Sequence, residues 1–546
     1  MGLELTAPNR ASAAVSIAIA LPWLNPAAGG PSAVMQPWLL AAMMTLLLWA
    51  VIDPPVTRYV LALAIGTGAL LVSVGREAPP VLLAVASLAV IAACAAVGAA
   101  SGSRAWIARA IANGWLVAAL ASSLLALLQY FGAASAFAPW VDPTQAGEAF
   151  ANLRQRNQFA TLTSIGLVSL LWRVHDGGRL AWALPTAVLL AFANAASASR
   201  TGALQILVVL ALTLWWLRAR PARATGVAMA ATLGYALAAV LLPMALQHFA
   251  GISAPSAFGR LANAEGCGSR TVLWSNVLHL IAQKPWWGWG WGELDYAHFA
   301  TLYAEPRFCD ILDNAHNLPL HLAVELGLPV AALACAAFAT WLLRQRPWGE
   351  SDATRQLAWG AVAVILLHSL LEYPLWYGPF QMALGFSLGL LAVRSGPLAT
   401  GLVGRFGRSS IHAALVLGLA YTAWDYHRIS QLYVAPEERS AWYRHRPLPQ
   451  VGDSWLFRDQ VAFAELSAAG LTQENAATVH ALAMDLLHYS PEPRVIDVAI
   501  ESALWLGRED EALWLLARLR AAFPDEHAKL AAAPPAPAAS QRPVNR

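Results

Sequence analysis

Long apolar runs recur along the chain, each close to the length that crosses a lipid bilayer, and they constrain the fold more than any other feature. Roughly 20 apolar residues in a helix span the hydrocarbon core, and a helix satisfies its own backbone hydrogen bonds there. Charged residues make up only 12% of the chain, against about 25% in soluble domains. The runs predict an all-α, polytopic membrane protein of about thirteen spans, at residues 11–25, 36–52, 58–75, 81–100, 107–131, 158–174, 180–197, 202–218, 225–248, 319–343, 355–372, 375–393 and 409–426.

The composition changes after the last apolar run, which predicts a division into domains. We expect a transmembrane domain over residues 1–428, with a long loop at about 249–318. Charge then rises, and residues 475–487 and 493–523 have the periodicity of antiparallel amphipathic helices. The pattern resembles one or two tetratricopeptide units, too few for a free-standing solenoid. We therefore expect a soluble helical domain over 429–530 that packs on its neighbours, and a disordered Ala/Pro-rich tail over 531–546.

The distribution of arginine predicts the orientation of the chain in the membrane. If the N-terminus is cytoplasmic, the short cytoplasmic loops carry most of the arginines, among them Arg104, Arg109, Arg173 and Arg179. The opposite loops are much longer and are poorer in arginine for their length. This arrangement places the long loop and the C-terminal domain on the outer side.

Polar clusters at the predicted outer ends of the spans are the candidate functional residues, because burying an ionisable group at a membrane boundary is costly. In chain order they comprise Arg154, Arg156, Asn157 and Gln158; Arg200 in a short Ser-Arg-Thr-Gly turn; Arg270; and His316 with Asn317. The arginines suit contact with phosphate. Ordinary interfacial anchoring or snorkelling is the alternative for each arginine.

Two of these clusters lie at expected helix starts. Arg270 falls in a first helical turn, where a cation is unfavourable unless it pairs with an anion. Pro319 marks the next helix start, so His316 stands just outside a helix N-terminus. The positive end of the helix dipole disfavours a charged ring, so we expect a neutral His316 that accepts a proton. His321 and Glu325, one turn apart, are expected to form an internal polar pair.

Other polar features allow two interpretations each. Glu372 and Tyr373, in the break between two spans, suit contact with a phosphate-bound sugar or the orientation of another site residue; an interfacial aromatic turn is the alternative. Cys267 and Cys309 flank a polar-aromatic segment and form a disulfide if that segment faces an oxidising compartment, or otherwise remain free thiols. We expect no metal ligand cluster and no nucleic-acid-binding face.

Four motifs in order resemble the O-antigen ligase/polymerase superfamily: Arg-Asn-Gln before a span, Ser-Arg-Thr-Gly, Ser-Arg-x-x-x-Trp with a later Pro-Trp-Trp-Gly-x-Gly, and His-Asn with a later Glu-x-Gly. The Glu-Tyr-Pro-Leu-Trp-Tyr turn and the C-terminal helices resemble its bacterial protein O-oligosaccharyltransferase (PglL-like) branch. This resemblance implies a glycosyltransferase of the bacterial inner membrane with a periplasmic site. Its donor would be a glycan on undecaprenyl diphosphate, and its acceptor a Ser or Thr of an exported protein such as a pilin.

The resemblance also assigns roles to individual residues. By motif, His316 matches the family's essential histidine, and Arg200 and Arg270 match its diphosphate-contacting arginines. Gln158 and Tyr373 match residues associated with activity in the protein-glycosylating branch. The sugar–diphosphate bond already carries a good leaving group, so the implied reaction requires no cofactor and inverts the anomeric centre.

Three other functions compete with this interpretation. An O-antigen ligase acting on lipid A-core, or an O-antigen polymerase, would use the same donor site, and the C-terminal domain favours a protein acceptor instead. A polytopic transporter is disfavoured because the charged groups gather at one face rather than at the midplane. A membrane-bound scaffold leaves the arginine and histidine set unexplained.

Overall fold

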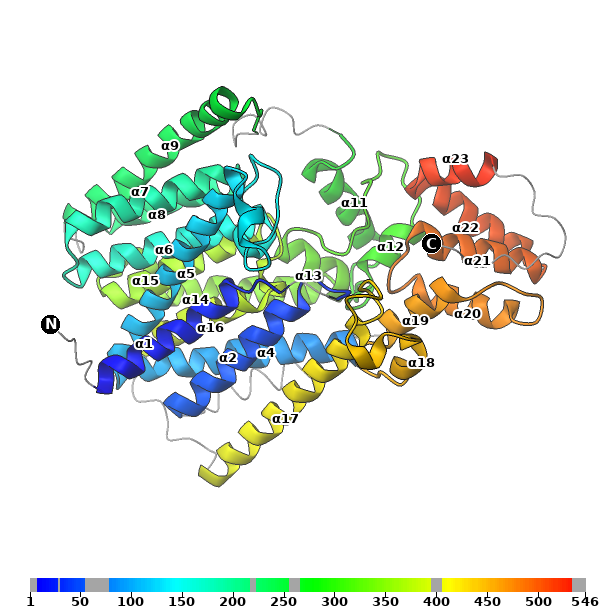
Figure 1. The fold of residues 1–546 in the computed structure, drawn as a ribbon, viewed down its shortest axis with the longest axis horizontal. Helices are drawn as coiled ribbons and strands as arrows, with labels where there is room; N and C mark the ends of the chain where they lie inside the picture. The colour runs from blue at the N-terminus through cyan, green and yellow to red at the C-terminus, as the bar shows by residue number, and fades with distance from the viewer. Residues whose placement is uncertain are drawn as a thin grey trace.

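The computed structural model describes residues 7–27, 30–54, 78–216, 222–254, 266–393 and 405–532, and its regular elements there are helices (Figure 1). Several are long and apolar enough to cross a membrane: α2 (Met35–Ile52), α4 (Ala78–Ala99), α5 (Trp106–Tyr130), α9 (Ala222–Ala250) and α14 (Leu328–Gln345). The chain is therefore a multi-pass membrane protein.

Further helices complete the bundle: α1 (Ala7–Ala20), α6 (Arg156–His175), α7 (Leu180–Ala196), α8 (Arg200–Trp215), α15 (Ala353–Ser369), α16 (Gly378–Ala392) and α17 (Arg405–Ser430). Each predicted span coincides with a helical segment except residues 58–75, which lie outside the described residues. The total of about thirteen spans stays a prediction. α4 and α16 pack backbone to backbone, because a Cβ at Gly98, Gly385 or Gly389 would overlap a carbonyl of the facing helix.

The prediction of one span over residues 319–343 is wrong. The segment breaks at Gly327 into α13 (Leu318–Leu326) and α14, with a φ of +84° that favours glycine. A Cβ at Gly327 would overlap the carbonyl of Trp286, which packs against the break. The amides of Trp289 and Gly290 donate to carbonyls of α13 at 2.9 and 3.0 Å. The Trp/Gly-rich segment 286–290 therefore packs against the break that makes α13 and the apolar α14 separate helices.

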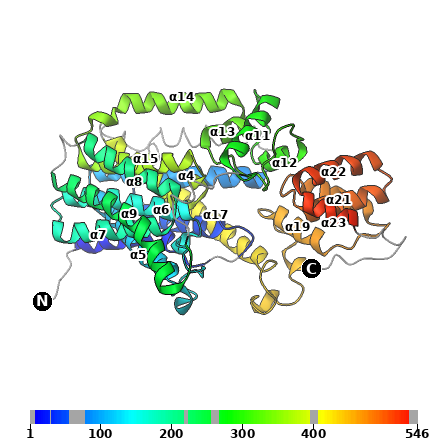
Figure 2. The same cartoon turned by 90° about the horizontal axis from the view of Figure 1, so that it is seen from above.

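The C-terminal region consists of short helices packed on one another: α19 (Arg458–Ala468), α20 (Ala476–Leu486), α21 (Pro493–Trp505), α22 (Glu509–Ala522) and α23 (Pro524–Ala532). The structure divides the predicted 493–523 helical stretch at Gly507, where φ is +71°. Residues 533–546, most of the predicted tail, lie outside the described residues. These helices sit together at one end of the molecule, beside α11 (Arg270–Gln283) and α12 (Leu294–Ala300) of the long loop (Figures 1 and 2).

Candidate active site

The N-termini of four helices meet at one end of the bundle. Asn157, in the first turn of α6, accepts a hydrogen bond from the N-cap residue of α8, Ser199, at 2.6 Å. The Asn157 amide donates to Glu372 at 3.1 Å. Glu372 also contacts Arg270, the first residue of α11, and His316, which directly precedes the N-cap of α13. Each helix N-terminus carries partial positive charge, so together they favour an anionic ligand.

Glu372 is the centre of this site, in the turn between α15 and α16. Its Oε1 atom accepts from Arg270 Nη2 at 2.5 Å, and its Oε2 atom lies 2.7 Å from His316 Nδ1. The side chains of Glu372, His316 and Arg270 are 12%, 18% and 31% exposed. The carboxylate is therefore enclosed, while the arginine and histidine remain accessible to a ligand.

The contacts of His316 determine which ring nitrogen carries a proton. Nδ1 lies near both Glu372 Oε2 and Arg270 Nη2, the latter at 2.9 Å. An arginine only donates and a carboxylate only accepts, and Arg270 already has Glu372 Oε1 as its acceptor. We therefore assign the proton to Nδ1, which donates to Glu372. Nε2 then keeps a free lone pair, with no hydrogen-bond partner among the described residues, and is able to accept a proton from a hydroxyl.

The electrostatics of Glu372 support this assignment. Burial alone would raise the pKa of the Glu372 carboxyl, but the hydrogen bond and the charge of His316, together with the charge of Arg270, hold that pKa below its ordinary value. Glu372 is therefore ionised at neutral pH. An ionised partner keeps the His316 proton on Nδ1.

The backbone of His316 is held in an uncommon conformation. Its φ of +49° lies in the left-handed region, which non-glycine residues rarely adopt. The His316 amide donates to Asn314 Oδ1 at 2.9 Å, and the Trp274 indole of α11 donates to the Ala315 carbonyl at 3.1 Å. Strain of this kind persists where the surroundings enforce it, as is common at functional sites.

Arg200 lies next to this network, and no carboxylate among the described residues pairs with it. Arg200 is the first residue of α8, and its side chain is exposed. The preceding residue, Ser199, contacts Asn157. Arg200 thus offers a free guanidinium beside the site, whereas Arg270 is already paired.

An aromatic group borders the site. The ring of Tyr373 lies 5.1 Å from that of His316, and the ring of Tyr377 stacks 6.2 Å from Tyr373. Tyr377 also shares a hydrogen bond with the buried side chain of Gln158. Gln158 and Tyr377 line a cavity of about 110 Å³ together with residues that follow α1 and residues at the start of α2.

Three candidate residues have partners that occupy their polar groups. Arg154 forms an ion pair with Asp142, with Nε 2.8 Å from Oδ2, and Arg156 pairs with Glu148. Both carboxylates belong to the loop before α6, so these arginines stabilise that loop. Asn317 caps α13 and donates to the Leu370 carbonyl at 3.0 Å. It fixes α13 against the end of α15.

A buried polar layer, which the sequence motifs do not predict, lies below the site. Thr161 Oγ1 lies 2.9 Å from His368 Nδ1 and accepts from Gln205 Nε2 at 2.8 Å. Thr161 also donates to the Asn157 carbonyl, and the Glu372 amide donates to the His368 carbonyl. The layer therefore supports both Asn157 and Glu372. Its signal in the sequence is a set of polar residues inside apolar runs.

The predicted polar pair in α13 is confirmed. His321 Nε2 lies 3.4 Å from Glu325 Oε2, and both side chains are almost fully buried. Burial raises the pKa of Glu325 to about 8 and lowers that of His321 to about 3. At neutral pH, both groups are therefore uncharged, which makes the pair a packing feature of α13.

The Glu372→Gln variant is expected to lower turnover about 100-fold, because a neutral amide forms no ion pair with Arg270 and has one acceptor oxygen where the carboxylate contacts Arg270 and His316 with two. Initial rates with purified protein would measure this. The amide is nearly isosteric, so thermal unfolding should change little. Unchanged turnover would show that Glu372 does not orient His316.

Most of these residues lie in regions of the chain that match known protein families. Residues 149–174 match a family described as protein glycosylation ligase, 185–335 match O-antigen ligase, and 356–536 match virulence factor membrane-bound polymerase, C-terminal. The three matches contain Asn157 and Gln158, then Arg200, Arg270 and His316, then Glu372 and Tyr373. The site is thus assembled from all three matched regions.

Two curated proteins of Acinetobacter baylyi are similar to the chain. A general O-oligosaccharyltransferase is 25% identical over 285 residues, covering 51% of this chain and 49% of that protein. A ComP-specific O-oligosaccharyltransferase is 25% identical over 251 residues, covering 46% and 45%. The chain spans about half the length of these relatives. It carries the O-antigen ligase family region together with the protein glycosylation ligase motif, and it is a distant relative of O-oligosaccharyltransferases.

Proposed function

We propose that the chain transfers a glycan from undecaprenyl diphosphate to a Ser or Thr hydroxyl of an exported protein such as a pilin, at the periplasmic face of the bacterial inner membrane. The observation that carries the proposal is the convergence of Arg270, His316 and Glu372 where four helix N-termini meet. Such a site suits a diphosphate beside a general base. The resemblance of the chain to O-oligosaccharyltransferases supports the reaction class.

The proposed reaction is a single displacement. His316 Nε2 takes the proton of the acceptor hydroxyl, whose oxygen forms a bond to the anomeric carbon of the glycan. The bond from that carbon to the diphosphate oxygen breaks, and undecaprenyl diphosphate leaves with the electron pair. Arg270 and the unpaired Arg200 neutralise the charge that develops on the leaving group. Glu372 holds the imidazole in line and stabilises it once it is protonated.

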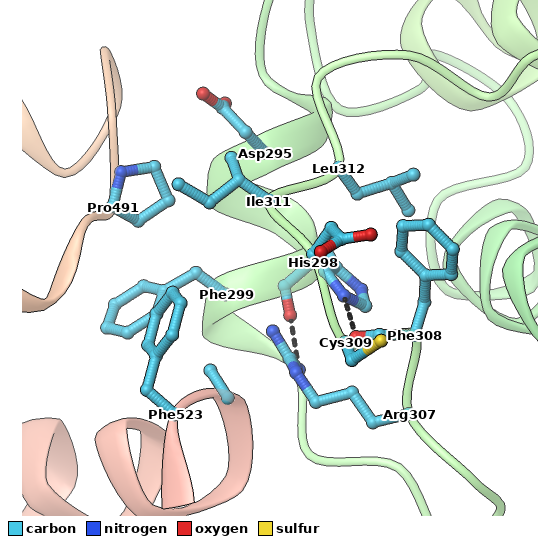
Figure 3. A pocket seen from close by; sticks show the side chains of 12 residues that line it. Asp295, His298, Phe299, Arg307, Phe308, Cys309, Ile311, Leu312, Pro491 and Phe523 are labelled. Atoms are coloured by element: carbon cyan, nitrogen blue, oxygen red, sulfur yellow. Dashed lines mark hydrogen bonds between the residues drawn. The ribbon is translucent and has the colours of Figure 1, made fainter. Parts of the chain in front are cut away.

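The C-terminal helices are the proposed platform for the protein acceptor, because they pack directly on the loop that carries the site. His488 Nδ1 lies 2.6 Å from Glu293, and its ring stacks on Tyr296 with the ring centres 3.6 Å apart. Arg518 donates to the Ala300 carbonyl at 2.9 Å. Figure 3 shows α12 of the loop facing Pro491 and Phe523 of the C-terminal region. An acceptor held on these helices would therefore lie close to the catalytic loop.

Loosening this contact is expected to impair transfer to protein more than donor hydrolysis. The His488→Ala/Arg518→Ala variant loses the Glu293 pair and the Ala300 hydrogen bond, so the KM for the acceptor protein should rise about 10-fold. Hydrolysis of the lipid-linked glycan by water should continue at the wild-type rate. Arg508→Ala, which removes an exposed pair with Glu511 on the same helical region, is the matched control. Equal losses of transfer and hydrolysis would contradict the platform role.

The direct test compares exported proteins from two strains that make a defined lipid-linked glycan, one with and one without the gene for this chain. Mass spectrometry of Ser/Thr peptides should show the glycan mass only when the chain is present. The family matches to O-antigen ligase and membrane-bound polymerase favour lipid A-core ligation or repeat-unit polymerisation as the second candidate. A changed lipopolysaccharide ladder, with unmodified peptides, would decide for that candidate.

A further inference from the structure

A covalent bond joins the two segments that carry Arg270 and His316. Cys267 and Cys309 form a disulfide across a separation of 42 residues, with their Cα atoms 5.4 Å apart. Cys267 lies three residues before Arg270, and Cys309 lies seven residues before His316. The bridge therefore sets the spacing between the start of α11 and the segment that leads into α13.

Hydrogen bonds continue this connection from the bridge to the site. The Asn276 side chain of α11 accepts from the Phe308 amide at 2.8 Å and donates to the Pro306 carbonyl at 3.0 Å. Nearer the site, the Trp274 indole of α11 donates a hydrogen bond to the Ala315 carbonyl. The segment from Phe308 to His316 thus runs along α11, and the disulfide joins it to the residue three positions before Arg270.

The segment around Cys309 is also fixed on its other side. Arg307 donates to the carbonyls of His298 and Thr301 at 2.8 and 3.0 Å, and His298 Nε2 lies 3.2 Å from the Phe308 carbonyl (Figure 3). These contacts attach the segment to α12. Only the disulfide attaches it to the residues that immediately precede Arg270 among those described.

We propose that the Cys267–Cys309 disulfide is a positioning element of the site, so that the chain becomes active only after these two thiols are oxidised. This rests on the proposed function. Oxidation occurs by thiol–disulfide exchange: the two thiols give two electrons and two protons to an external disulfide oxidant, which becomes two thiols. Catalysis would then be confined to a chain that has reached an oxidising compartment.

The physical reason lies at the first residue of α11. Arg270 stands at a helix end, where its position depends on what holds the preceding residues. When the bridge opens, the start of α11 and the His316 segment can separate, and a displacement of about 1 Å is enough to cost about 100-fold in rate. A bridge that served stability alone would change unfolding and leave the turnover of the folded protein unchanged.

The test uses the full-length Cys335→Ser protein in detergent, because Cys335 is exposed whereas the remaining free cysteine, Cys94, is buried. The substrates are a synthetic undecaprenyl-diphosphate-linked disaccharide and a purified pilin. Reduction with dithiothreitol, verified by thiol counting, is expected to lower kcat about 100-fold. Oxidised glutathione should restore it. Bridging the two thiols with a methylene group from diiodomethane should also restore it and make the protein insensitive to reduction.

Hydrogen exchange supplies a readout that does not require transfer. Reduction should accelerate exchange at the amides of Phe308 and His316, which are hydrogen-bonded in the described state. A folded, reduced protein with unchanged kcat would overturn the inference, whether or not exchange accelerates. An oxidised protein that transfers no glycan to any Ser or Thr would overturn the proposed function instead, while accelerated exchange on reduction would still support the positioning role.

Discussion

The His316→Ala variant is expected to lose glycan transfer by about 10²- to 10⁴-fold, the range typical for removal of a general base. The nearby imidazole of His368 is buried and contacts Thr161, so it is not accessible to the acceptor hydroxyl as a substitute base. Initial rates with a lipid-linked glycan and a pilin acceptor measure the loss.

The control for His316→Ala is to show that the variant protein is present and folded. The side chain is partly exposed, and its backbone is held separately by Asn314 and Trp274. Thermal unfolding in detergent should therefore remain close to wild type. A folded His316→Ala protein that glycosylates the acceptor at the normal rate would exclude His316 as the base.

The Arg270→Ala variant is expected to lower kcat by about 10²- to 10³-fold, as for removal of one group that stabilises developing negative charge. The donor diphosphate would keep Arg200 but lose the second guanidinium. Glu372 would lose its cationic partner but keep its contact with His316. Single-turnover measurements with saturating donor separate this effect from weaker donor binding.

Two comparisons make the Arg270 result specific. Arg270→Lys keeps the charge but loses the planar guanidinium and its fixed donor geometry, so partial activity is expected. Arg156→Ala removes an arginine of the same region that pairs with Glu148 in its own loop, and should lower stability rather than turnover. An Arg156→Ala defect equal to that of Arg270→Ala would contradict the division of roles between them.

Local rules predicted part of this site from the sequence. A cation at a helix start needs an anion, which singled out Arg270, and Pro319 placed His316 before a helix N-terminus. The structure shows that the anion for Arg270 is Glu372, 102 residues away in the chain. Periodicity and composition contain no information about a pairing at that separation. The convergence of four helix starts therefore required the structure.

The unconfirmed parts have physical causes too. Arg154 and Arg156 were candidates for phosphate contact, but Asp142 and Glu148 of the preceding loop bind them. Such competition between an internal carboxylate and a ligand is invisible in a motif. The break at Gly327 was missed because hydropathy continues unchanged through it, whereas its φ of +84° does not fit a helix.

In the site without a ligand, the Glu372 carboxylate is the counterion of Arg270. An incoming anion must displace that carboxylate, and a small monovalent anion gains little from doing so. A diphosphate carries more charge and also has Arg200 as a partner without a competing carboxylate. As the donor takes over Arg270, Glu372 is left to interact with His316 alone. Donor binding would thereby leave the carboxylate to hold His316 at the moment when a glycan is present to be transferred.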